Sequence, residues 1–420
     1  MQHVQEGAAA VSDGQGGLRD GVQALLGELA GIGRDRRCGG FTRPAWTAQD
    51  AALGEWFEAS CTARGLDVVR DRAGNQWAWW GDPDAGDLPG RGVATGGHLD
   101  SVPAAGGYHG PLGVVTALLA VDALRARDVR PRRPLAVVRF VDEEGARFGM
   151  PSVGSRLLTG LVGPERVLGL RDAHGVTYAE ALAAAGLDPV TFGPDEAAVR
   201  RVSTFVGLGL EQGYGLAGVD APLGAVRSVH PHGWWRVEIE GRADHAGTAP
   251  LAGRSDAVLE LARLVQTVRA TAARYDALAT VGQVEVSPGA VTTVAAHVTA
   301  WLDVRAEGVA QLRGVIGELR MAGFDVLEQF YAPPVALDEA LTAEVTAAVT
   351  AEADLPDELP ALVPATGSAA AVLAAAGIAS AALLVRNPTG VSNTPQEHAD
   401  PQDCAAGVRA LTAALARVAG

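Results

Sequence analysis

Two stretches of the chain decide its fold, RGVATGGHLD at residues 91–100 and PLAVVRFVDEEG at residues 134–145. Each begins with a short apolar run typical of a buried strand and ends in charged or imidazole side chains. Residues 112–126, between them, have helical spacing. Strand, helix and strand with polar residues at the strand ends predict an open α/β sheet whose crevice lies at the carboxyl ends of its strands.

Further elements follow on both sides of this unit. On the N-terminal side we expect a helix over 46–67 and two strands over 68–80, joined by a turn at Gly74-Asn75. Beyond residue 230 a β-α-β-β-α order, closed by one more strand, predicts a compact α+β insertion. Its strands are expected at 234–240, 280–286, 297–305 and 324–329, and its helices at 254–272 and 309–322. The alternating strand at 234–240 is interpreted as an edge strand, and a helix at 341–351 with the region 383–395 returns to the main sheet.

The length of the chain indicates more than one domain. Its 420 residues exceed the size at which a single hydrophobic core stops growing, and 48% hydrophobic with 20% charged residues is typical of a globular protein. We predict a discontinuous main domain formed by residues 18–215 and 332–420. Residues 216–331 form the inserted domain, and residues 1–17 form a loose leader.

Composition excludes several functions. The net charge is −15 and the arginines form no block, which argues against nucleic-acid or membrane partners. No apolar run reaches the length of a membrane span, and no signal peptide is recognisable. The three cysteines are far apart and suggest neither disulfides nor a cysteine zinc site. We therefore expect a soluble, cytoplasmic protein. All 34 basic residues are arginine, which rules out a pyridoxal phosphate Schiff base and a P-loop lysine.

The residues at the two strand ends suggest acid–base or metal chemistry. Asp100 is placed to orient the imidazole of His98 two residues earlier. Glu143 and Glu144 are adjacent, so their side chains point in opposite directions. One of them could bind a metal while the other acts as a general base on water.

The motifs around these residues closely resemble the M20 metallopeptidase superfamily, and more narrowly its branch of N-carbamoyl-amino-acid hydrolases, β-ureidopropionase and allantoate amidohydrolase. The resemblance runs in family order from about residue 20 to the C-terminus. It implies a zinc-peptidase-like catalytic domain, a mixed sheet with helices on both faces, and an inserted ferredoxin-like lid that also forms a homodimer. The blocks that carry it are GHLDSVP at 97–103, GGYHGPLGV at 106–114, DEEGARFG at 142–149, GSR at 154–156, LEQG at 210–213, HAGTAP at 245–250, RSDA at 254–257, LDVR at 302–305 and SNTPQE at 392–397.

The resemblance also implies two metal ions, usually zinc, held by five ligands. His98 and Glu144 match ligand positions, and Glu143 matches the general base. Three ligand positions depart from the pattern: His109 replaces the bridging aspartate, and Gly209 and Asn393 each replace a histidine. A Gly-His-Asp-Ala block is also lost, since residues 367–370 read GSAA.

These replacements argue against a two-metal site. A neutral imidazole cannot bridge two cations as a carboxylate does, glycine offers no side-chain donor, and an asparagine amide is a poor zinc ligand. We therefore favour the absence of a functional metal. A single zinc ion on His98, His109 and Glu144 remains an alternative, because two histidines and one glutamate form a known catalytic zinc set.

The substrate side of the family pattern is better retained. Arg305 matches the arginine that grips a substrate carboxylate, a bidentate task suited to a guanidinium group. His245 matches the histidine that reaches across the dimer and polarises the scissile carbonyl. Gln212, Thr293 and Asn393 complete the expected substrate contacts, with Thr293 in place of a family asparagine. The histidines at 230, 232 and 297 have no family counterpart and are interpreted as surface or lid residues.

Three functions follow from this pattern. The favoured one is an enzyme acting on a C–N bond of a small, carboxylate-bearing amino-acid derivative, with Glu143 moving protons and without the dinuclear metal site. Hydrolysis and the reverse condensation or cyclisation are both open, and closure of the lid brings its residues to the substrate. The alternatives are a conventional metal-dependent amidohydrolase with a mononuclear site and a non-catalytic ligand-binding pseudoenzyme.

Overall fold

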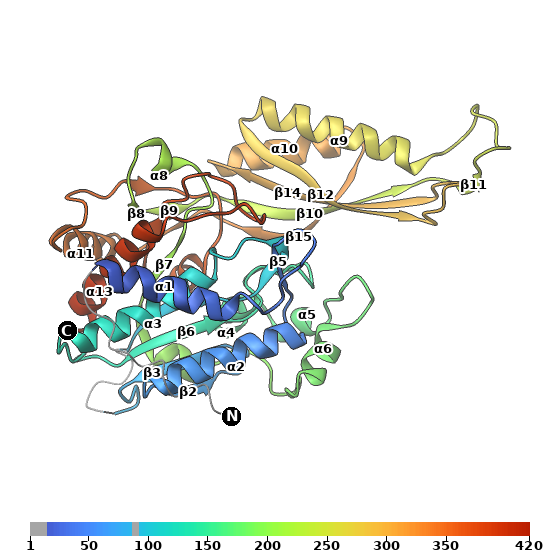
Figure 1. Cartoon of the computed structure of the whole chain (residues 1–420). Helices are drawn as coiled ribbons and strands as arrows, with labels where there is room; N and C mark the ends of the chain where they lie inside the picture. The colour runs from blue at the N-terminus through green and yellow to red at the C-terminus, as the bar shows by residue number, and fades with distance from the viewer. Residues whose placement is uncertain (1–14, 86–91) are drawn as a thin grey trace. The chain divides into compact units, whose positions relative to one another are not determined.

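The computed structural model describes residues 15–85 and 92–420 (Figure 1). The chain forms two compact units. The first comprises the residues up to Ser228 together with 336–364 and 368–420, and the second comprises Val229–Val335 with 365–367. Of the predicted leader, residues 1–14 lie outside the described residues, and helix α1 (Gln15–Leu29) begins directly after them.

The first unit is built on an eight-stranded mixed sheet. Its order is β17 (Ala361–Leu362), β8 (Leu223–Val226), β18 (Ala379–Val385), β7 (Val202–Leu210), β4 (Gly92–His98), β6 (Leu135–Phe140), β3 (Gln76–Trp80) and β2 (Asp67–Arg70). The central strands β18, β7, β4 and β6 are parallel, whereas β3 pairs antiparallel with both β6 and β2. Strand β6 is buried along its whole length, as expected for a parallel strand covered on both faces.

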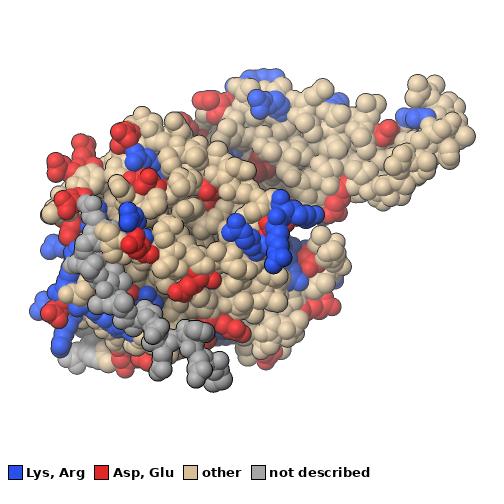
Figure 2. Space-filling model, in the orientation of Figure 1, with Lys and Arg blue, Asp and Glu red and all other residues tan. Residues whose placement is uncertain are grey.

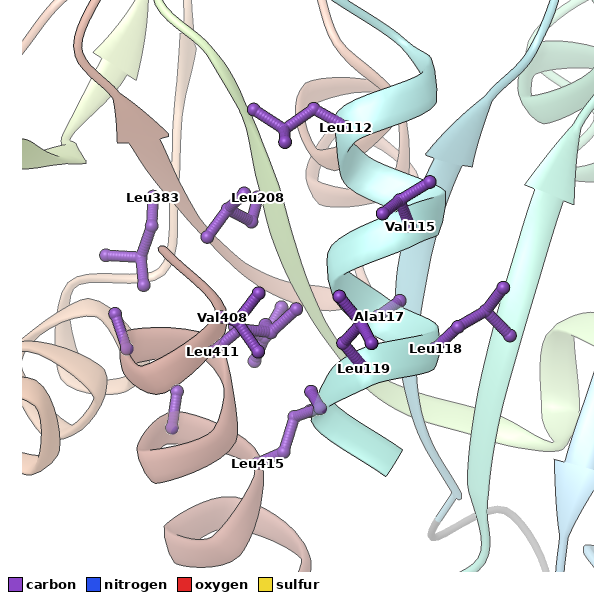
Figure 3. Packing of buried hydrophobic residues seen from close by; sticks show 14 of the residues in the cluster. Leu112, Val115, Ala117, Leu118, Leu119, Leu208, Leu383, Val408, Leu411 and Leu415 are labelled. Atoms are coloured by element: carbon purple, nitrogen blue, oxygen red, sulfur yellow. The ribbon is translucent and has the colours of Figure 1, made fainter. Parts of the chain in front are cut away.

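Helices cover both faces of this sheet. On one face lie α1, α2 (Ala48–Ala63), α3 (Pro111–Ala126), α11 (Glu339–Thr350) and α13 (Pro401–Ala419). Their apolar side chains form the main core with the strands, and Figure 3 shows members of this core from α3 (Leu112, Val115, Leu118, Leu119), from β7 and β18 (Leu208, Leu383) and from α13 (Leu411). The other face carries α4 (Val153–Leu158) and α12 (Ala369–Ala375). The predicted fold class, a mixed-sheet α/β domain with an added α+β domain, is confirmed.

The second unit has the βαββαβ order of a ferredoxin-like fold. Its antiparallel sheet has the order β12 (Ala277–Ser287), β14 (His297–Ala306), β10 (His232–Glu240) and β15 (Asp325–Ala332). Helices α9 (Ala257–Arg274) and α10 (Val309–Met321) pack together on the sheet, and Leu264, Val298 and Leu319 belong to their common core (Figure 1).

The interpretation of residues 234–240 as an edge strand is wrong. Strand β10 lies in the interior of the sheet, paired with β14 on one side and β15 on the other. Its alternation arises because one face of the sheet is covered by helices and the other is not. An interior antiparallel strand with one exposed face alternates as clearly as an edge strand does.

Two surface properties complete the description. Acidic and basic side chains are interspersed on the face in view in Figure 2. Among the helices of residues 15–85 and 92–420, none combines the length and the apolar character needed to cross a membrane.

Candidate active site

His98 stands at the carboxyl end of β4 and is held by Asp100. Its Nδ1 atom lies 3.1 Å from the Asp100 carbonyl oxygen and 3.3 Å from Oδ1 of the Asp100 carboxylate. Asp100 is only 2% exposed, and its Oδ2 accepts a hydrogen bond of 3.0 Å from the backbone N–H of Glu144. Burial disfavours the charged ring, but the Asp100 carboxylate outweighs it and raises the pKa of His98 to about 9. Asp100 thus ties the loop after β4 to the loop after β6.

The loop after β6, which carries Glu143 and Glu144, is fixed by its backbone. Asp142 has a φ of 50° and Gly145 a φ of 61°, and a β-carbon at Gly145 would lie 2.2 Å from the Met150 carbonyl oxygen. Glycine is therefore required at this turn. The backbone N–H of Ser152 donates to the Glu143 carbonyl at 2.8 Å, which closes the loop onto the start of α4.

The side chain of a buried asparagine, Asn75, forms hydrogen bonds with both ends of the loop after β6. Asn75 is fully buried; its Oδ1 accepts from the Val141 N–H at 3.1 Å and its Nδ2 donates to the Gly154 carbonyl at 3.1 Å. The same Nδ2 donates to Asp71 Oδ2 at 2.8 Å, and that oxygen also accepts from the Trp77 indole at 2.8 Å. The turn between β2 and β3 therefore holds both ends of the loop that presents Glu143.

Glu143 has the environment of a proton-transfer group. Its Oε2 atom is buried and has no hydrogen-bond partner among the described residues. Burial raises the pKa of Glu143 to about 7, against the opposing charge of His98. A carboxyl group with a pKa near neutrality can both accept and return a proton, as general acid–base catalysis requires.

His109 lies between two carboxylates. Its Nε2 is 2.6 Å from Glu144 Oε1, and its Nδ1 is 2.6 Å from Glu397 Oε2. Glu397 is completed by the backbone N–H groups of Tyr108 and His109, at 3.1 and 2.9 Å to Oε1, and by the Ser392 hydroxyl at 2.7 Å to Oε2. Burial disfavours the charged ring, but the two carboxylates raise the pKa of His109 to about 10. His109 in turn holds the pKa of Glu397 at about 2, although burial opposes this.

The residues at the family's ligand positions do not fit a two-metal centre. No three His, Cys, Asp or Glu side chains among residues 15–85 and 92–420 are arranged to hold a metal ion together. Both ring nitrogens of His109 face carboxylate oxygens, Gly209 at the end of β7 offers no side chain, and Asn393 is exposed. The structure thus brings His98, Asp100, Glu143, Glu144 and His109 to one edge of the sheet without forming a ligand set.

The predicted carboxylate clamp is held rigidly in the second unit. Arg305 Nε and Nη2 each donate to one Asp303 oxygen at 2.7 Å, and Nη1 donates to the Ala365 carbonyl at 2.8 Å. Asp303 also accepts from the Trp234 indole at 2.9 Å. This network fixes the plane and direction of the guanidinium group, as recognition of a carboxylate demands.

Two other predicted residues meet in the second unit. His245 in β11 (Asp244–His245) is the register partner of Thr293 in β13 (Thr293–Val294). His245 is exposed, and its Nδ1 accepts from the Gly247 N–H at 3.1 Å. Arg254 supports the following turn through the Ala246 and Ala249 carbonyls, both at 2.7 Å from Nη2.

The remaining predicted residues are dispersed. Gln212 is half-buried just after β7, and Asn393 is exposed with a φ of 57°; both belong to the first unit. His230, His232 and His297 all lie in the second unit, where His297 is 2.8 Å from a Glu238 oxygen and 3.1 Å from a Glu240 oxygen.

Two residues of the site carry roles that sequence reasoning missed. In the sequence, Glu397 appeared only as the last residue of the block SNTPQE at 392–397, and Asn75 appeared only as part of the predicted turn Gly74-Asn75. A partial signal for Glu397 existed: a histidine buried among carboxylates needs hydrogen-bond partners for both ring nitrogens, and nearby carboxylates can supply them. The Gly74-Asn75 turn gave no indication that the amide reaches residues 141 and 154.

The chain is similar to known enzymes over most of its length. The model of peptidase family M20/M25/M40 matches residues 94–417. The N-carbamoyl-L-amino acid amidohydrolase of Geobacillus stearothermophilus is 31% identical over 92% of this chain and 95% of its own length. The allantoate amidohydrolase of Escherichia coli K12 is 28% identical over 96% of this chain and 98% of its own. The crystal structure of a hydantoinase/carbamoylase family amidase from Burkholderia vietnamiensis superimposes with a TM-score of 0.87 at 28% identity, covering 96% of this chain and 97% of that one. The predicted family and the prediction of an amidohydrolase-type enzyme are confirmed.

Proposed function

The chain belongs to peptidase family M20/M25/M40, and we propose that it acts on an amide, carbamoyl or ureido C–N bond of a small amino-acid derivative that carries a carboxylate. The names of its relatives support the bond type, since they are amidohydrolases of N-carbamoyl amino acids and of allantoate. The guanidinium of Arg305 supports the carboxylate, because Asp303 fixes the plane of a group whose geometry suits paired hydrogen bonds to carboxylates.

Glu143 is the general acid–base in this proposal, and the observation that carries it is its buried Oε2 atom, which has no hydrogen-bond partner among residues 15–85 and 92–420. In hydrolysis Glu143 accepts a proton from water as the oxygen attacks the carbonyl carbon. It then returns the proton to the nitrogen as the C–N bond breaks. In the reverse direction the same carboxylate takes a proton from the attacking amine and gives it to the departing oxygen, so the proposal covers both directions.

The reaction is assigned to this chain's own residues, without the family's dinuclear metal site. His98, oriented by Asp100, contributes a positively charged ring beside Glu143. His245 polarises the scissile carbonyl from the lid. A lid formed by the second unit (predicted as residues 216–331), a catalytic domain formed by the first unit (predicted as residues 18–215 and 332–420), a homodimer through the lid and a cytoplasmic location complete the proposal. Gln212, Thr293 and Asn393 are its further substrate contacts.

Substitution of Glu143 by glutamine tests this function. The protein should be assayed against a panel of N-carbamoyl and ureido carboxylates, with products identified by mass spectrometry. Because glutamine keeps the shape but cannot shuttle a proton, turnover should fall about 10²- to 10⁴-fold. Glu196→Gln is the matched control, since that carboxylate is exposed at 85% on a surface helix.

Two results would contradict the assignment. Turnover that survives Glu143→Gln at the wild-type rate would remove Glu143 from the mechanism. A ligand that raises the melting temperature but is never converted, across the whole panel and in both reaction directions, would favour the non-catalytic binding protein.

A further inference from the structure

The imidazole of His109 occupies the position that the family pattern gives to a bridging metal ligand, and enzymes of this family typically use divalent metals such as zinc. We propose that His109 is an internal cation that takes the place of those metal ions, pairing with Glu144 and Glu397 and joining three loops at the edge of the sheet. This inference goes beyond the proposed reaction, because it concerns what fills the site and holds for any substrate.

The distances distinguish an ion pair from a ligand set. Two ligands of one tetrahedral zinc ion, with Zn–N and Zn–O bonds of about 2.0–2.2 Å, lie about 3.4 Å apart. The ring nitrogens of His109 lie 2.6 Å from their carboxylate oxygens on both sides. That separation is the length of a short charge-assisted hydrogen bond. The ring nitrogens of His109 therefore contact the carboxylate oxygens directly in this structure.

The hydrogen-bond partners of His109 indicate the charge of its imidazole ring. A neutral imidazole donates from one nitrogen only, and its other nitrogen carries a lone pair. A lone pair facing a carboxylate oxygen at 2.6 Å would be repelled, and both nitrogens of His109 face such oxygens. With both carboxyl groups ionised, both nitrogens donate, so the ring carries a positive charge between the two carboxylates.

Burial makes the loss of either ion pair costly. The side chain of Glu397 is 0% exposed, that of His109 is 4% exposed and that of Glu144 is 15% exposed. A buried carboxylate without a partner is costly, and the family pattern would supply that partner to Glu144 as a metal ion. Here one imidazolium serves both carboxylates, and Ser392 with two backbone N–H groups satisfies the remaining lone pairs of Glu397.

The chain around His109 is packed for this arrangement. A β-carbon added at Gly106 would lie 2.4 Å from the β-carbon of Glu397, and one at Gly110 would lie 2.5 Å from the ring of His98. The backbone of the loop before α3 therefore presses against both neighbours. His109, Glu144 and Glu397 come from the segments before α3, after β6 and before α13, so the ion pairs connect parts of the chain as far as 288 residues apart.

The test compares wild type, His109→Asp and His109→Asn without any assay of turnover, so its outcome is independent of the proposed reaction. Metal content is measured by plasma mass spectrometry after dialysis against zinc-containing and then metal-free buffer. Thermal unfolding is followed with zinc chloride and with EDTA. We expect wild type to retain far less than one ion per chain and to have the same melting temperature in both solutions.

The two variants should separate charge from ligand chemistry. Both lose a buried charge pair, which should lower the melting temperature by about 5–10 °C. His109→Asp places a third carboxylate beside Glu144 and Glu397, so zinc should bind and restore most of that loss. His109→Asn adds no anionic ligand, and zinc should leave its melting temperature unchanged.

Three results would overturn the proposal. One is a wild-type protein that retains one or more zinc ions per chain, a measurement that requires no variant to fold. The second is a melting temperature for both variants equal to that of wild type, since no ion pair would then have been lost. The third is equal rescue of both variants by zinc, which would place the ion elsewhere.

Discussion

The two units differ in how far they depart from the family pattern. The comparison concerns the strand ends of the first unit and the strand end of the second unit that carries Arg305. In the first unit the ligand positions at 109, 209 and 393 are replaced, and an imidazolium pairs with the carboxylates that remain. In the second unit Arg305 is retained together with Asp303, which holds it by two bonds of 2.7 Å. This difference is expected if the protein binds a substrate carboxylate through Arg305 and transfers protons through Glu143 without the family's metal ions, as proposed above.

The largest effect on the retained side is expected at Arg305. Arg305→Ala removes the paired donors and leaves Asp303 facing any bound carboxylate, so KM should rise about 10²- to 10³-fold with a smaller change in kcat. Arg305→Lys keeps the charge but not the fork, and should raise KM about 10-fold. Steady-state kinetics measure both, with the exposed Arg269→Ala on the same unit as control. An unchanged KM in Arg305→Ala would show that the second unit has lost its binding role as well.

A smaller effect is expected at Asp100 on the replaced side. Asp100→Asn keeps the size of the side chain but removes the negative charge beside His98 and weakens the contact with the Glu144 N–H. We expect kcat to fall about 10- to 100-fold with KM nearly unchanged, because one charge-assisted hydrogen bond contributes about 1.5–3 kcal/mol. If instead KM alone changes, Asp100 belongs to substrate binding and does not orient the catalytic groups.

Much of the fold follows from local sequence patterns. The buried runs at β4 and β6 and the helical spacing of α3 predict the centre of the sheet, because period and apolarity are local properties. The position of β10 could not be predicted in the same way. Alternation reports which face of a strand is covered, but the neighbours of a strand in a sheet depend on the whole chain.

The site shows the same limit more sharply. The apolar runs placed His98, Glu143 and Glu144 at strand ends, and the family resemblance identified His109 as a replaced ligand. It gave no partner for His109, because Glu397 is 288 residues away and no local pattern connects the two. The one available indication was the set of charged residues. Glu144 and Glu397 are both present, and the aspartate that the family pattern expects at position 109 is a histidine.

The smallest effect on catalysis is expected at Asn75, which contacts no residue of the proposed reaction but holds both ends of the Glu143 loop. Asn75→Ala leaves the Val141 N–H, the Gly154 carbonyl and one Asp71 contact unsatisfied in a fully buried place. Since each such group costs about 1–3 kcal/mol, the free energy of unfolding should fall by about 3 kcal/mol.

The control separates loop positioning from general destabilisation. Asp338→Ala removes the N-cap of α11, where Asp338 accepts from the Leu341 N–H at 2.8 Å, and should cost about 1 kcal/mol without changing kcat. Asn75→Ala should lower kcat several-fold at a temperature where both variants remain folded, because Glu143 loses its fixed position while Arg305 does not. Equal kcat values for Asn75→Ala and wild type would mean that the loop keeps its geometry through Ser152, Asp142 and Gly145 alone. The backbone of the loop after β6 and the His109 ion pairs would then hold the site of the first unit in place. The turn between β2 and β3 would contribute to stability only.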